Sequence, residues 1–495
     1  MQHVVNITIP LSEYNEKIDF SIPISKNLGI NSSRIRYFRI LKKSIDSRHN
    51  SIRFHYQFQV FVDEDFTKPK IIEYSDVSNK PEVLIIGSGP AGLFAALRLI
   101  ELGLKPIIIE RGKPVSERKN DVAILCRQHI VNPESNYCFG EGGAGTFSDG
   151  KLYSRSNKRG DIQKILQILH NHGANESILY DSHPHIGTDI LPMVIKNIRN
   201  TIINHGGKFY FSKRFKSLLI NNDKIEGIEL YTGGKIYANS VIIATGHSAR
   251  DVFYSLNQQN VALEFKPFAV GVRVEHPQEL ISHIQYHGIK HDLLPAASYS
   301  LVSNIKGRGV FSFCMCPGGF IVPSATMPEQ VVVNGMSSSK RNSPFANSGI
   351  VVSININDIP EFKESGVFAG LKFQEKIENL AWNMADKTQK APAQRLSDFL
   401  NGICSQSLPQ SSYFPGIISS PIHKWLPLNL YDPLKHAFID FDRKMHGFIT
   451  NEAIVTAVES RTSSPIRILR DSQSYMSVSV KGLFPCGEGA GYAGG

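Results

Sequence analysis

Long apolar runs are missing from this sequence. No stretch offers the roughly 18 uninterrupted apolar residues that a membrane-spanning helix needs. The opening residues, MQHVVNITIPLSEYNEK, contain no basic segment followed by an apolar one, so we expect no secretory signal there. Cysteine is also sparse, because only six are scattered along 495 residues and only Cys314 and Cys316 lie close together. Such a distribution is typical of a reducing compartment, and we expect a cytoplasmic protein.

Acidic residues are fewer than basic ones. The chain has 54 Lys and Arg residues against 44 Asp and Glu residues, which gives a net charge of +10. The densest basic run, from Arg34 to Arg53, interleaves basic and aromatic side chains and could form an RNA-binding face. A solvated face of a sheet explains the same run, and we favour that interpretation, so we do not expect a nucleic-acid partner. A basic protein also attracts a phosphate-rich cofactor or an anionic substrate.

The length of the chain predicts several domains. Residues 1–78 are expected to be a small α+β domain, with strands in HVVNITI and SIRFHYQFQVFV, a short helix near Ile22–Leu28 and a strand around Ile35–Leu41. We expect an α/β fold in which a Rossmann-like domain is interrupted by a mixed-sheet domain. The predicted ranges are 1–78 for the N-terminal domain, 79–261 and 447–495 for the two parts of the Rossmann-like domain, and 262–446 for the mixed-sheet domain.

A dinucleotide fingerprint begins the second domain. EVLIIG predicts a strand, PAGLFAALRLIELG a helix and KPIIIER the next strand, which together make a parallel βαβ unit. Gly87, Gly89 and Gly92 occupy the G-x-G-x-x-G positions between the first strand and the helix, where backbone can approach a pyrophosphate. Glu110 ends the second strand, where a carboxylate can accept hydrogen bonds from ribose hydroxyls.

Two further G-x-G-x-x-G matches lack the strand and helix of the first. Gly140, Gly142 and Gly145 lie in NYCFGEGGAGTFSDGKL, a side-chain-poor loop suited to a flat ring or a pyrophosphate. The other match, Gly489, Gly491 and Gly494, ends the chain. Neither match predicts a second Rossmann motif. NAD(P)H therefore has no fingerprint of its own and is expected only as a transient co-substrate.

The sequence GSGPAG, with Glu110–Arg111 and the later VIIATG, resembles the flavoproteins of the glutathione-reductase type. The resemblance implies that the Rossmann-like domain is an FAD-binding domain and the mixed-sheet domain a substrate domain. It also implies that the first motif holds the ADP half of FAD, and that a late Gly–Glu segment, Gly487–Glu488, meets the ribityl chain and the flavin. The expected FAD contacts are Gly87, Gly89, Pro90, Ala91, Gly92, Glu110, Arg111, Gly142, Gly143, Thr146, Lys151, Thr245, Gly246, Gly487, Glu488 and Gly494.

A narrower resemblance covers nearly the whole chain. The segments NPESNYCFGEGGAGTFSDGKLYSR, FCMCPGG, VNGMSSSKRN, VESRTSSPIRILRD and GLFPCGEGAGYAGG are similar to bacterial FAD-dependent, or NAD-utilizing, dehydrogenases of unknown substrate. This resemblance implies an oxidoreductase that transfers hydride or electrons through FAD to or from an unidentified small molecule. Two alternatives stay open: an FAD-dependent RNA-modifying enzyme and a flavin-binding protein that does not catalyse a reaction.

Several polar residues are candidates for chemistry near the cofactor. Cys314 and Cys316 could form a redox dithiol, but a disulfide across one residue is strained, so we expect buried thiols and no metal site. Lys151, in a polar cluster with Ser148 and Asp149, could stabilise anionic reduced flavin. Further candidates, each with a structural alternative, are Arg273, His247, Arg461 and Arg467, and the two last arginines could instead pair with Glu459 or Asp471.

The end of the chain carries two more expectations. TNEAIVTAVESR predicts a helix that Pro465 ends, followed by the last strand, GLFPCG. A helix would normally follow that strand and approach the flavin. Because the sequence stops at Gly495, we expect a native chain longer by roughly one helix, about 15 to 25 residues.

Overall fold

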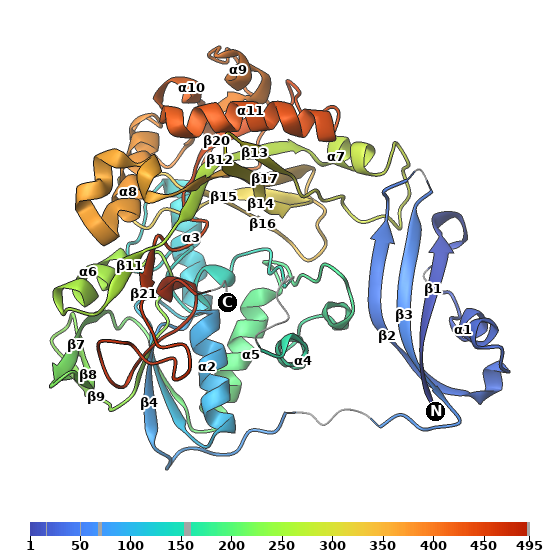
Figure 1. The fold of residues 1–495 in the computed structure, drawn as a ribbon, viewed down its shortest axis with the longest axis horizontal. Helices are drawn as coiled ribbons and strands as arrows, with labels where there is room; N and C mark the ends of the chain where they lie inside the picture. The colour runs from blue at the N-terminus through green and yellow to red at the C-terminus, as the bar shows by residue number, and fades with distance from the viewer. Residues whose placement is uncertain (16, 50, 68–71, 153–159, 493–495) are drawn as a thin grey trace.

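The computed structural model describes residues 1–15, 17–49, 51–67, 72–152 and 160–492. Its N-terminal part is a three-stranded antiparallel sheet in the order β1-β3-β2 with one α-helix against it (Figure 1). The elements are β1 (Gln2–Pro10), α1 (Ser21–Leu28), β2 (Ile35–Asp46) and β3 (Arg53–Val62). Alternate residues of β3 from Phe54 to Val60 are buried, so the sheet has one apolar face. The helix and the strand expected in this part are both present.

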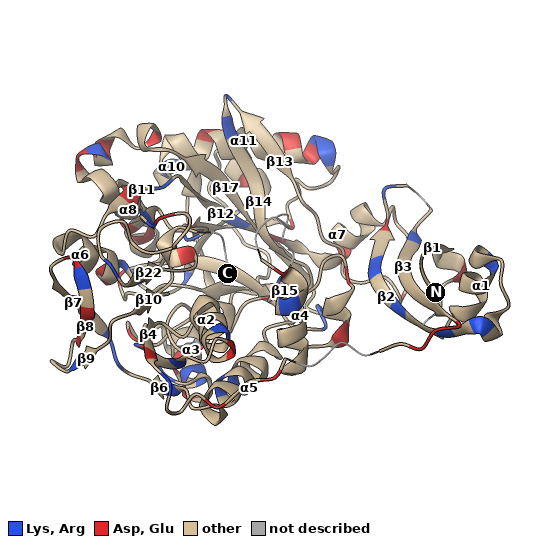
Figure 2. Cartoon of the chain, turned by 60° about the horizontal axis from the view of Figure 1, so that its bottom comes forward, with Lys and Arg blue, Asp and Glu red and all other residues tan. Residues whose placement is uncertain are grey.

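The basic run of the sequence lies on strand β2 and its flanks (Figure 2). Several of its charges already have partners, since Arg34 pairs with Asp63 at 2.6 Å and Arg48 pairs with Asp46 at 2.7 Å. The outer edge of β2 joins the rest of the molecule. There Lys43 N donates to the carbonyl of Tyr180 at 2.8 Å, and Ser182 N donates to the carbonyl of Lys43 at 2.9 Å.

A five-stranded parallel sheet in the order β22-β10-β4-β5-β6 forms the second part. Its strands are β4 (Glu82–Ile86), β5 (Lys105–Ile109), β6 (Lys208–Tyr210), β10 (Val241–Ile243) and β22 (Leu483–Pro485). Both predicted strands of the βαβ unit and the helix between them are confirmed. The chain thus leaves this sheet after β10 and returns to it only at β22, across about half of the sequence.

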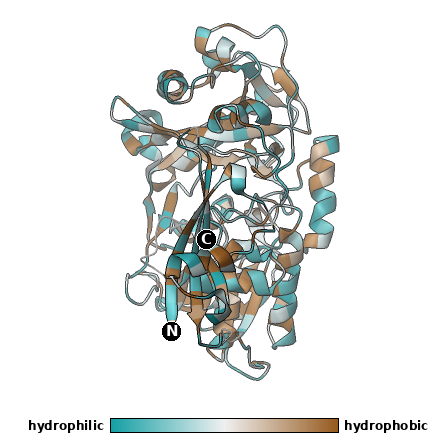
Figure 3. Cartoon of the chain, turned by 90° about the vertical axis from the view of Figure 1, so that its right-hand side faces the viewer, coloured by the Kyte–Doolittle hydropathy of each residue, from teal (hydrophilic) through white to brown (hydrophobic). Residues whose placement is uncertain are grey.

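Helices cover one face of the parallel sheet and a small antiparallel sheet covers the other. The helices are α2 (Pro90–Glu101), α4 (Ile162–Asn171) and α5 (Leu191–Asn204), and α3 (Val115–Gln128) runs beside α5. The other face packs against β7 (Phe215–Asn221), β8 (Lys224–Leu230), β9 (Lys235–Tyr237) and α6 (Arg250–Gln258). Hydrophobic and hydrophilic residues alternate along the helices, as expected for elements with one buried face (Figure 3).

A seven-stranded mixed sheet forms the third part, in the order β13-β14-β17-β12-β20-β18-β19. Its strands are β12 (Phe268–Pro277), β13 (Val302–Ile305), β14 (Arg308–Cys316), β17 (Phe345–Ile354), β18 (Ala391–Arg395), β19 (Ile417–Ser419) and β20 (Ile454–Glu459). The surrounding elements are β11 (Leu263–Phe265), α7 (Gln278–Gln285), β15 (Gly319–Pro323), β16 (Val333–Ser337), α8 (Ala369–Asn383), α9 (Leu396–Asn401), α10 (Ile422–Trp425), α11 (Leu428–Lys444) and β21 (Ile466–Ile468). Helices α9 to α11 lie outside this sheet, and the parallel sheet lies on its other side (Figure 1).

The prediction of a helix at TNEAIVTAVESR is wrong, because this segment contains strand β20, Ile454–Glu459. Three β-branched residues run consecutively from Ile454 to Thr456, and such side chains favour strands. Strand β20 is central, between β12 and β18, and all six of its residues are buried, so no polar face marks it as a strand. Pro465 accordingly ends no helix. The range expected to belong to the FAD-binding domain from residue 447 onward therefore starts with a strand of the mixed sheet.

No helix in the described ranges is both long and apolar enough to cross a membrane.

Candidate functional site

Three glycine-containing turns meet at the carboxyl edge of the parallel sheet. They follow strands β4, β10 and β22, which lie side by side. In open parallel α/β sheets this edge is where ligands bind. A Cβ placed at Gly87 would lie 2.4 Å from the carbonyl oxygen of Ala244 and 3.3 Å from Cα of Thr245, so the first two turns are in direct contact.

The three glycines of the first motif are required for different reasons. Gly87 has a φ of +102°, and a Cβ at Gly92 would lie only 2.0 Å from the carbonyl oxygen of Gly87. Packing within the protein thus demands both. Gly89, the N-cap of α2, has an ordinary φ of −70°, and the nearest atom to a Cβ there is 3.9 Å away. Nothing in the described chain demands a glycine at 89, and Pro90 follows it as the first residue of the helix.

The second glycine-rich segment lies directly on the first turn. Gly142 N donates to the carbonyl of Ser88 at 2.9 Å, and a Cβ at Gly143 would lie 3.1 Å from Cα of Gly89. Gly142 and Gly143 both have positive φ angles, of +76° and +57°. They enter a single 3-10 turn, Gly143–Gly145, so this segment is a loop, as the sequence predicts.

A buried arginine supports that loop. Arg118 of α3 donates to the carbonyls of Asn136, Tyr137 and Glu141 and, from Nη1, to the hydroxyl of Thr146 at 3.2 Å. Thr146 in turn donates to the carbonyl of Glu141 at 2.6 Å. Burial lowers the pKa of Arg118 to about 10, although nearby Glu110 and Glu141 oppose the change. Sequence reasoning missed Arg118, since nothing local distinguishes it from the other charged residues of α3.

Glu110 joins three loops through one carboxylate. It accepts from Ser88 N and Ser88 Oγ, both at 2.9 Å, from Gly112 N at 2.9 Å and from Gly140 N at 3.1 Å. A carboxylate has about four lone-pair sites, so these four hydrogen bonds use its capacity. A ribose bound at Glu110 would have to replace at least one of them.

A pocket of about 310 Å³ opens beside Glu110, at the end of β5. Arg111 and Arg214 line it, each lying over an aromatic ring: Arg111 over Phe139 at 4.2 Å and Arg214 over Tyr231 at 4.0 Å. Both guanidinium groups are also held by carboxylates. Each pairs with Glu134 and Asp251 at 3.0 Å. Arg214 and Tyr231 were not predicted, because they come from the ends of β7 and β8, and only the folded chain brings them to the first motif.

The late Gly–Glu segment reaches the same edge. A Cβ at Gly487 would lie 2.7 Å from Cβ of Ala91 at the start of α2, and one at Gly489 would lie 2.5 Å from backbone of Gly246. Glu488 starts a 3-10 turn that ends at Ala490, and its carboxylate makes no hydrogen bond to the described residues. Gly494 lies outside the described residues. The structure thus brings Ala91, Gly246 and Gly487 together.

His247 follows the β10 turn and faces a buried cluster of charges. Burial lowers the pKa of His247; Arg461 and Arg250 act in the same direction, and Glu488 opposes them. Arg461 is 6% exposed and makes a two-bond contact with Glu378, from Nε to Oε1 at 3.1 Å and from Nη2 to Oε2 at 3.0 Å. Arg461 therefore has a structural partner, but this partner is Glu378 and neither of the expected residues.

The other two candidate arginines also have carboxylate partners. Arg467 pairs with Glu264 at 2.6 Å, and both side chains are about 40% exposed. Arg273 of β12 is fully buried, where its Nε lies 2.8 Å from Glu459 and its Nη1 donates to Asn347 at 2.7 Å. Glu264 and Glu378 were not singled out from the sequence, because each lies more than 80 residues from its arginine.

Lys151 extends from the glycine-rich loop to strand β14. Its Nζ lies 3.2 Å from Asp149 Oδ2, 3.5 Å from Cys314 Sγ and 3.3 Å from Cys316 Sγ. Burial disfavours the ammonium, but both cysteines and Asp149 outweigh it and raise the pKa of Lys151. Ser148 closes the loop by donating to the carbonyl of Gly145 at 2.8 Å. A flavin contact of Lys151 stays a prediction.

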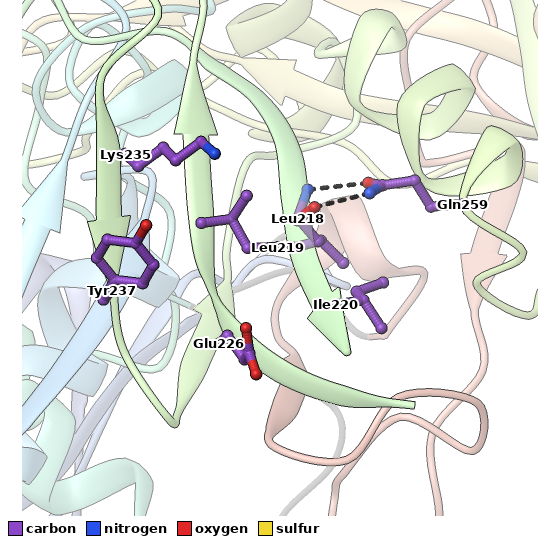
Figure 4. Close-up of a pocket in the computed structure, with 7 residues that line it drawn as sticks. All are labelled: Leu218, Leu219, Ile220, Glu226, Lys235, Tyr237 and Gln259. Carbon is purple, nitrogen blue, oxygen red and sulfur yellow. Dashed lines mark hydrogen bonds between the residues drawn. The ribbon is translucent and has the colours of Figure 1, made fainter. Parts of the chain in front are cut away.

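A further hollow, of about 480 Å³, lies away from this edge, on the small sheet β7-β8-β9 (Figure 4). The side chain of Gln259 in the hollow accepts from Leu218 N at 2.9 Å and donates to the carbonyl of Leu218 at 2.7 Å. None of the expected cofactor contacts lines it. Its lining residues are Leu218, Leu219, Ile220, Glu226, Lys235, Tyr237 and Gln259.

Comparison with known proteins gives three domain matches. Residues 80–237 match an FAD binding domain, and residues 267–462 match a domain described as FAD-dependent protein, C-terminal domain-like. Residues 1–61 match a domain of unknown function.

Two solved structures are distant likenesses. CtdE in complex with FAD is 11% identical, with 83% of this chain and 78% of that chain covered and a TM-score of 0.30. The flavin-dependent brominase Bmp2 is 13% identical, with 62% and 61% covered and a TM-score of 0.31. At such TM-scores these likenesses carry no argument about this chain.

One relative is much closer in sequence. A protein of Clostridium beijerinckii, named only as uncharacterized, is 39% identical over 494 residues, which cover 95% of this chain and 92% of the relative. The two matched domains indicate FAD as the cofactor. The chain belongs to one family with the clostridial protein.

Proposed function

We propose that this protein binds FAD at the carboxyl edge of its parallel sheet and transfers hydride or electrons between the flavin and a small molecule. Gly89 is the observation that carries the proposal. Its φ is ordinary, and a Cβ there would lie 3.9 Å from its nearest neighbour, Cα of Gly143, which is an ordinary contact distance, so the fold of the protein does not require a glycine. Close approach of a pyrophosphate to the backbone explains the glycine.

The start of α2 suits the diphosphate. The helix has 12 residues, and its first N–H groups point out of its N-terminus, where the helix dipole is positive. Gly143 lies against Gly89 at this point, so the glycine-rich loop would cover the diphosphate from the other side.

The pocket at Arg111 and Arg214 suits the adenosine half. Arg111, Arg214 and Tyr231 line it, and guanidinium and phenol groups can stack on an adenine. Glu110 lies between this pocket and the start of α2, the position at which ribose hydroxyls would replace one of its four present hydrogen bonds.

Gly246, Gly487 and Glu488 would meet the ring end of the cofactor. FAD supplies the hydride or electron chemistry when bound, and the protein positions it. His247 stays neutral at pH 7, because its pKa is lowered, and can accept a proton from a bound ligand at a ring nitrogen. NAD(P)H as a reductant, the small-molecule substrate and the glutathione-reductase-type placement stay predictions.

The cofactor content of the purified full chain tests the proposal. Heat release followed by chromatography should yield FAD, and recovery of FMN alone would overturn the assignment, since FMN lacks the ADP half. Gly89→Val should lose FAD, because its side chain occupies the space of the diphosphate, while the melting temperature without cofactor stays near that of the parent.

Gly234→Val is the matched control. Gly234 also has no left-handed φ, and a Cβ there would have its nearest neighbour at 3.8 Å, but it lies on the β8–β9 turn, away from the site. The control should keep stoichiometric FAD. Equal FAD content in Gly89→Val and Gly234→Val would show that the diphosphate binds elsewhere.

A further inference from the structure

Cys314 and Cys316 lie at a bulge in strand β14. The pairing of β14 with β17 shifts register between Phe313 and Cys316. Cys314 has a left-handed φ of +47°, which residues other than glycine rarely adopt. Such backbone occurs preferentially at functional sites. The bulge brings both sulfurs to one ammonium group, Lys151 Nζ, at 3.5 Å and 3.3 Å.

Two cations lie at the two cysteines. Lys151 Nζ is within 3.5 Å of both sulfurs, and the buried Arg273 donates from Nη1 to the carbonyl of Cys314 at 3.4 Å. Each cation also has a carboxylate partner, Asp149 for Lys151 and Glu459 for Arg273. A nearby positive charge favours the thiolate form of a cysteine.

The two thiols differ in exposure and in the direction of their pKa shifts. Cys314 is partly exposed, whereas Cys316 is fully buried. A hydrogen bond from Cys316, with help from Lys151 and Arg273, lowers the pKa of Cys314, while the same hydrogen bond and burial raise the pKa of Cys316. Cys314 is thus the thiol that a small reagent can reach, with Lys151 beside it to favour its thiolate form. Cys316 lies buried next to it, and its Sγ donates to the carbonyl of Cys314 at 3.3 Å.

We propose that Cys314 and Cys316 form a redox-active pair that reacts with hydrogen peroxide, in which Cys314 is the nucleophile, Cys316 resolves the product to a disulfide and Lys151 holds the thiolate. The strain of a disulfide across one residue, which argues against a structural bridge, fits a bond that forms and breaks reversibly. The proposal does not depend on FAD binding, because the contacts of Cys314, Cys316 and Lys151 that support it are all made within the protein.

The reaction balances in two steps. The Cys314 thiolate attacks one peroxide oxygen, so an S–O bond forms, the O–O bond breaks and the leaving hydroxide takes a proton from Lys151 to become water. The Cys316 thiol returns a proton to Lys151, and its sulfur attacks Cys314 Sγ, forming the S–S bond and releasing hydroxide, which solvent protonates. The two sulfurs lose two electrons in total, and the peroxide gains them.

Alkylation of the reduced full chain by iodoacetamide, followed by mass spectrometry, tests the thiolate. At pH 6.5, Cys314 should react at least about ten times faster than the exposed Cys404, because the thiolate is the nucleophile and Lys151 favours it on Cys314. Lys151→Met should remove this advantage and Lys151→Arg should largely keep it, while Lys216→Met, on strand β7, should leave it unchanged. Equal rates for Cys314 and Cys404, or an unchanged rate in Lys151→Met, would overturn the proposal.

One equivalent of hydrogen peroxide tests the pair. The peptide containing Cys314 and Cys316 should lose the mass of two hydrogens and regain it with dithiothreitol. In Cys316→Ser, dimedone should instead trap a sulfenic acid on Cys314, while Cys404→Ser should behave like the parent. Two free thiols after peroxide treatment, or oxidation of Cys404 ahead of Cys314, would contradict the assignment.

Discussion

The carboxylate of Glu110 accepts two hydrogen bonds from Ser88, one from its backbone N–H and one from its hydroxyl, each at 2.9 Å. Its other oxygen accepts from the backbone of Gly112 and Gly140. Glu110 thus fixes the turn after β4, the end of β5 and the glycine-rich loop relative to one another. The residue expected to hold a ribose already organises the loops on which the ribose would rest.

Glu110→Gln should therefore destabilise the protein even without a cofactor. The amide turns one accepting oxygen into a donor that faces N–H groups, and a hydrogen bond to a charged group contributes roughly 1.5–3 kcal/mol. We expect the free energy of unfolding in urea to fall by about 2–3 kcal/mol. Glu452→Gln, at an exposed position, is the control and should change it by less than about 0.5 kcal/mol. Equal stabilities of the two variants would show that the carboxylate is not needed to hold the loops.

Gly92→Ala should damage the fold, unlike a substitution at Gly89. The added Cβ would lie 2.0 Å from the carbonyl oxygen of Gly87, a backbone atom that cannot move without displacing the first turn. Overpacking of this kind costs about 1–3 kcal/mol or more. Thermal melting without cofactor should show the loss in Gly92→Ala and not in Gly234→Ala. A Gly92→Ala protein that melts like the parent would mean that the turn adapts.

The first motif was predictable because its signals are local. Gly87, Gly89 and Gly92 lie within six residues of one another, and the flanking segments EVLIIG and PAGLFAALRLIELG place them between a strand and a helix. Arg118 and Glu378 were missed because their roles depend on carbonyls and guanidinium groups far along the chain. Strand β20 was mistaken for a helix because it is buried on both faces, so the alternation that marks a strand is absent.

Arg461 and Arg467 should respond differently to substitution by alanine. Removing Arg461 leaves the buried Glu378 with Arg250 and the hydroxyl of Ser460 as partners, and breaking a buried pair costs about 3–5 kcal/mol. The Arg467–Glu264 pair is well exposed, and such pairs contribute about 0–1 kcal/mol. The free energy of unfolding in urea should be well below the parental value for Arg461→Ala and close to it for Arg467→Ala. A stable Arg461→Ala protein with an altered flavin spectrum would instead mean that Arg461 serves the cofactor.

Acid should weaken the fold through Glu378. Burial raises its pKa, but Arg250 and Arg461 outweigh burial and lower the pKa from 4.5 to about 2. Because the folded-state pKa lies below the unfolded one, the stabilisation is fully present above pH 4.5 and disappears as the pH falls toward 2. A shift of this size corresponds to about 3 kcal/mol.

The free energy of unfolding, measured in urea at steps from pH 6 to pH 2.5, should fall more steeply below pH 4.5 for the parent than for Glu378→Gln, which has no proton to gain. Glu452→Gln should keep the parental slope. Identical pH profiles for the parent and Glu378→Gln would show that this carboxyl titrates alike in the folded and unfolded chains.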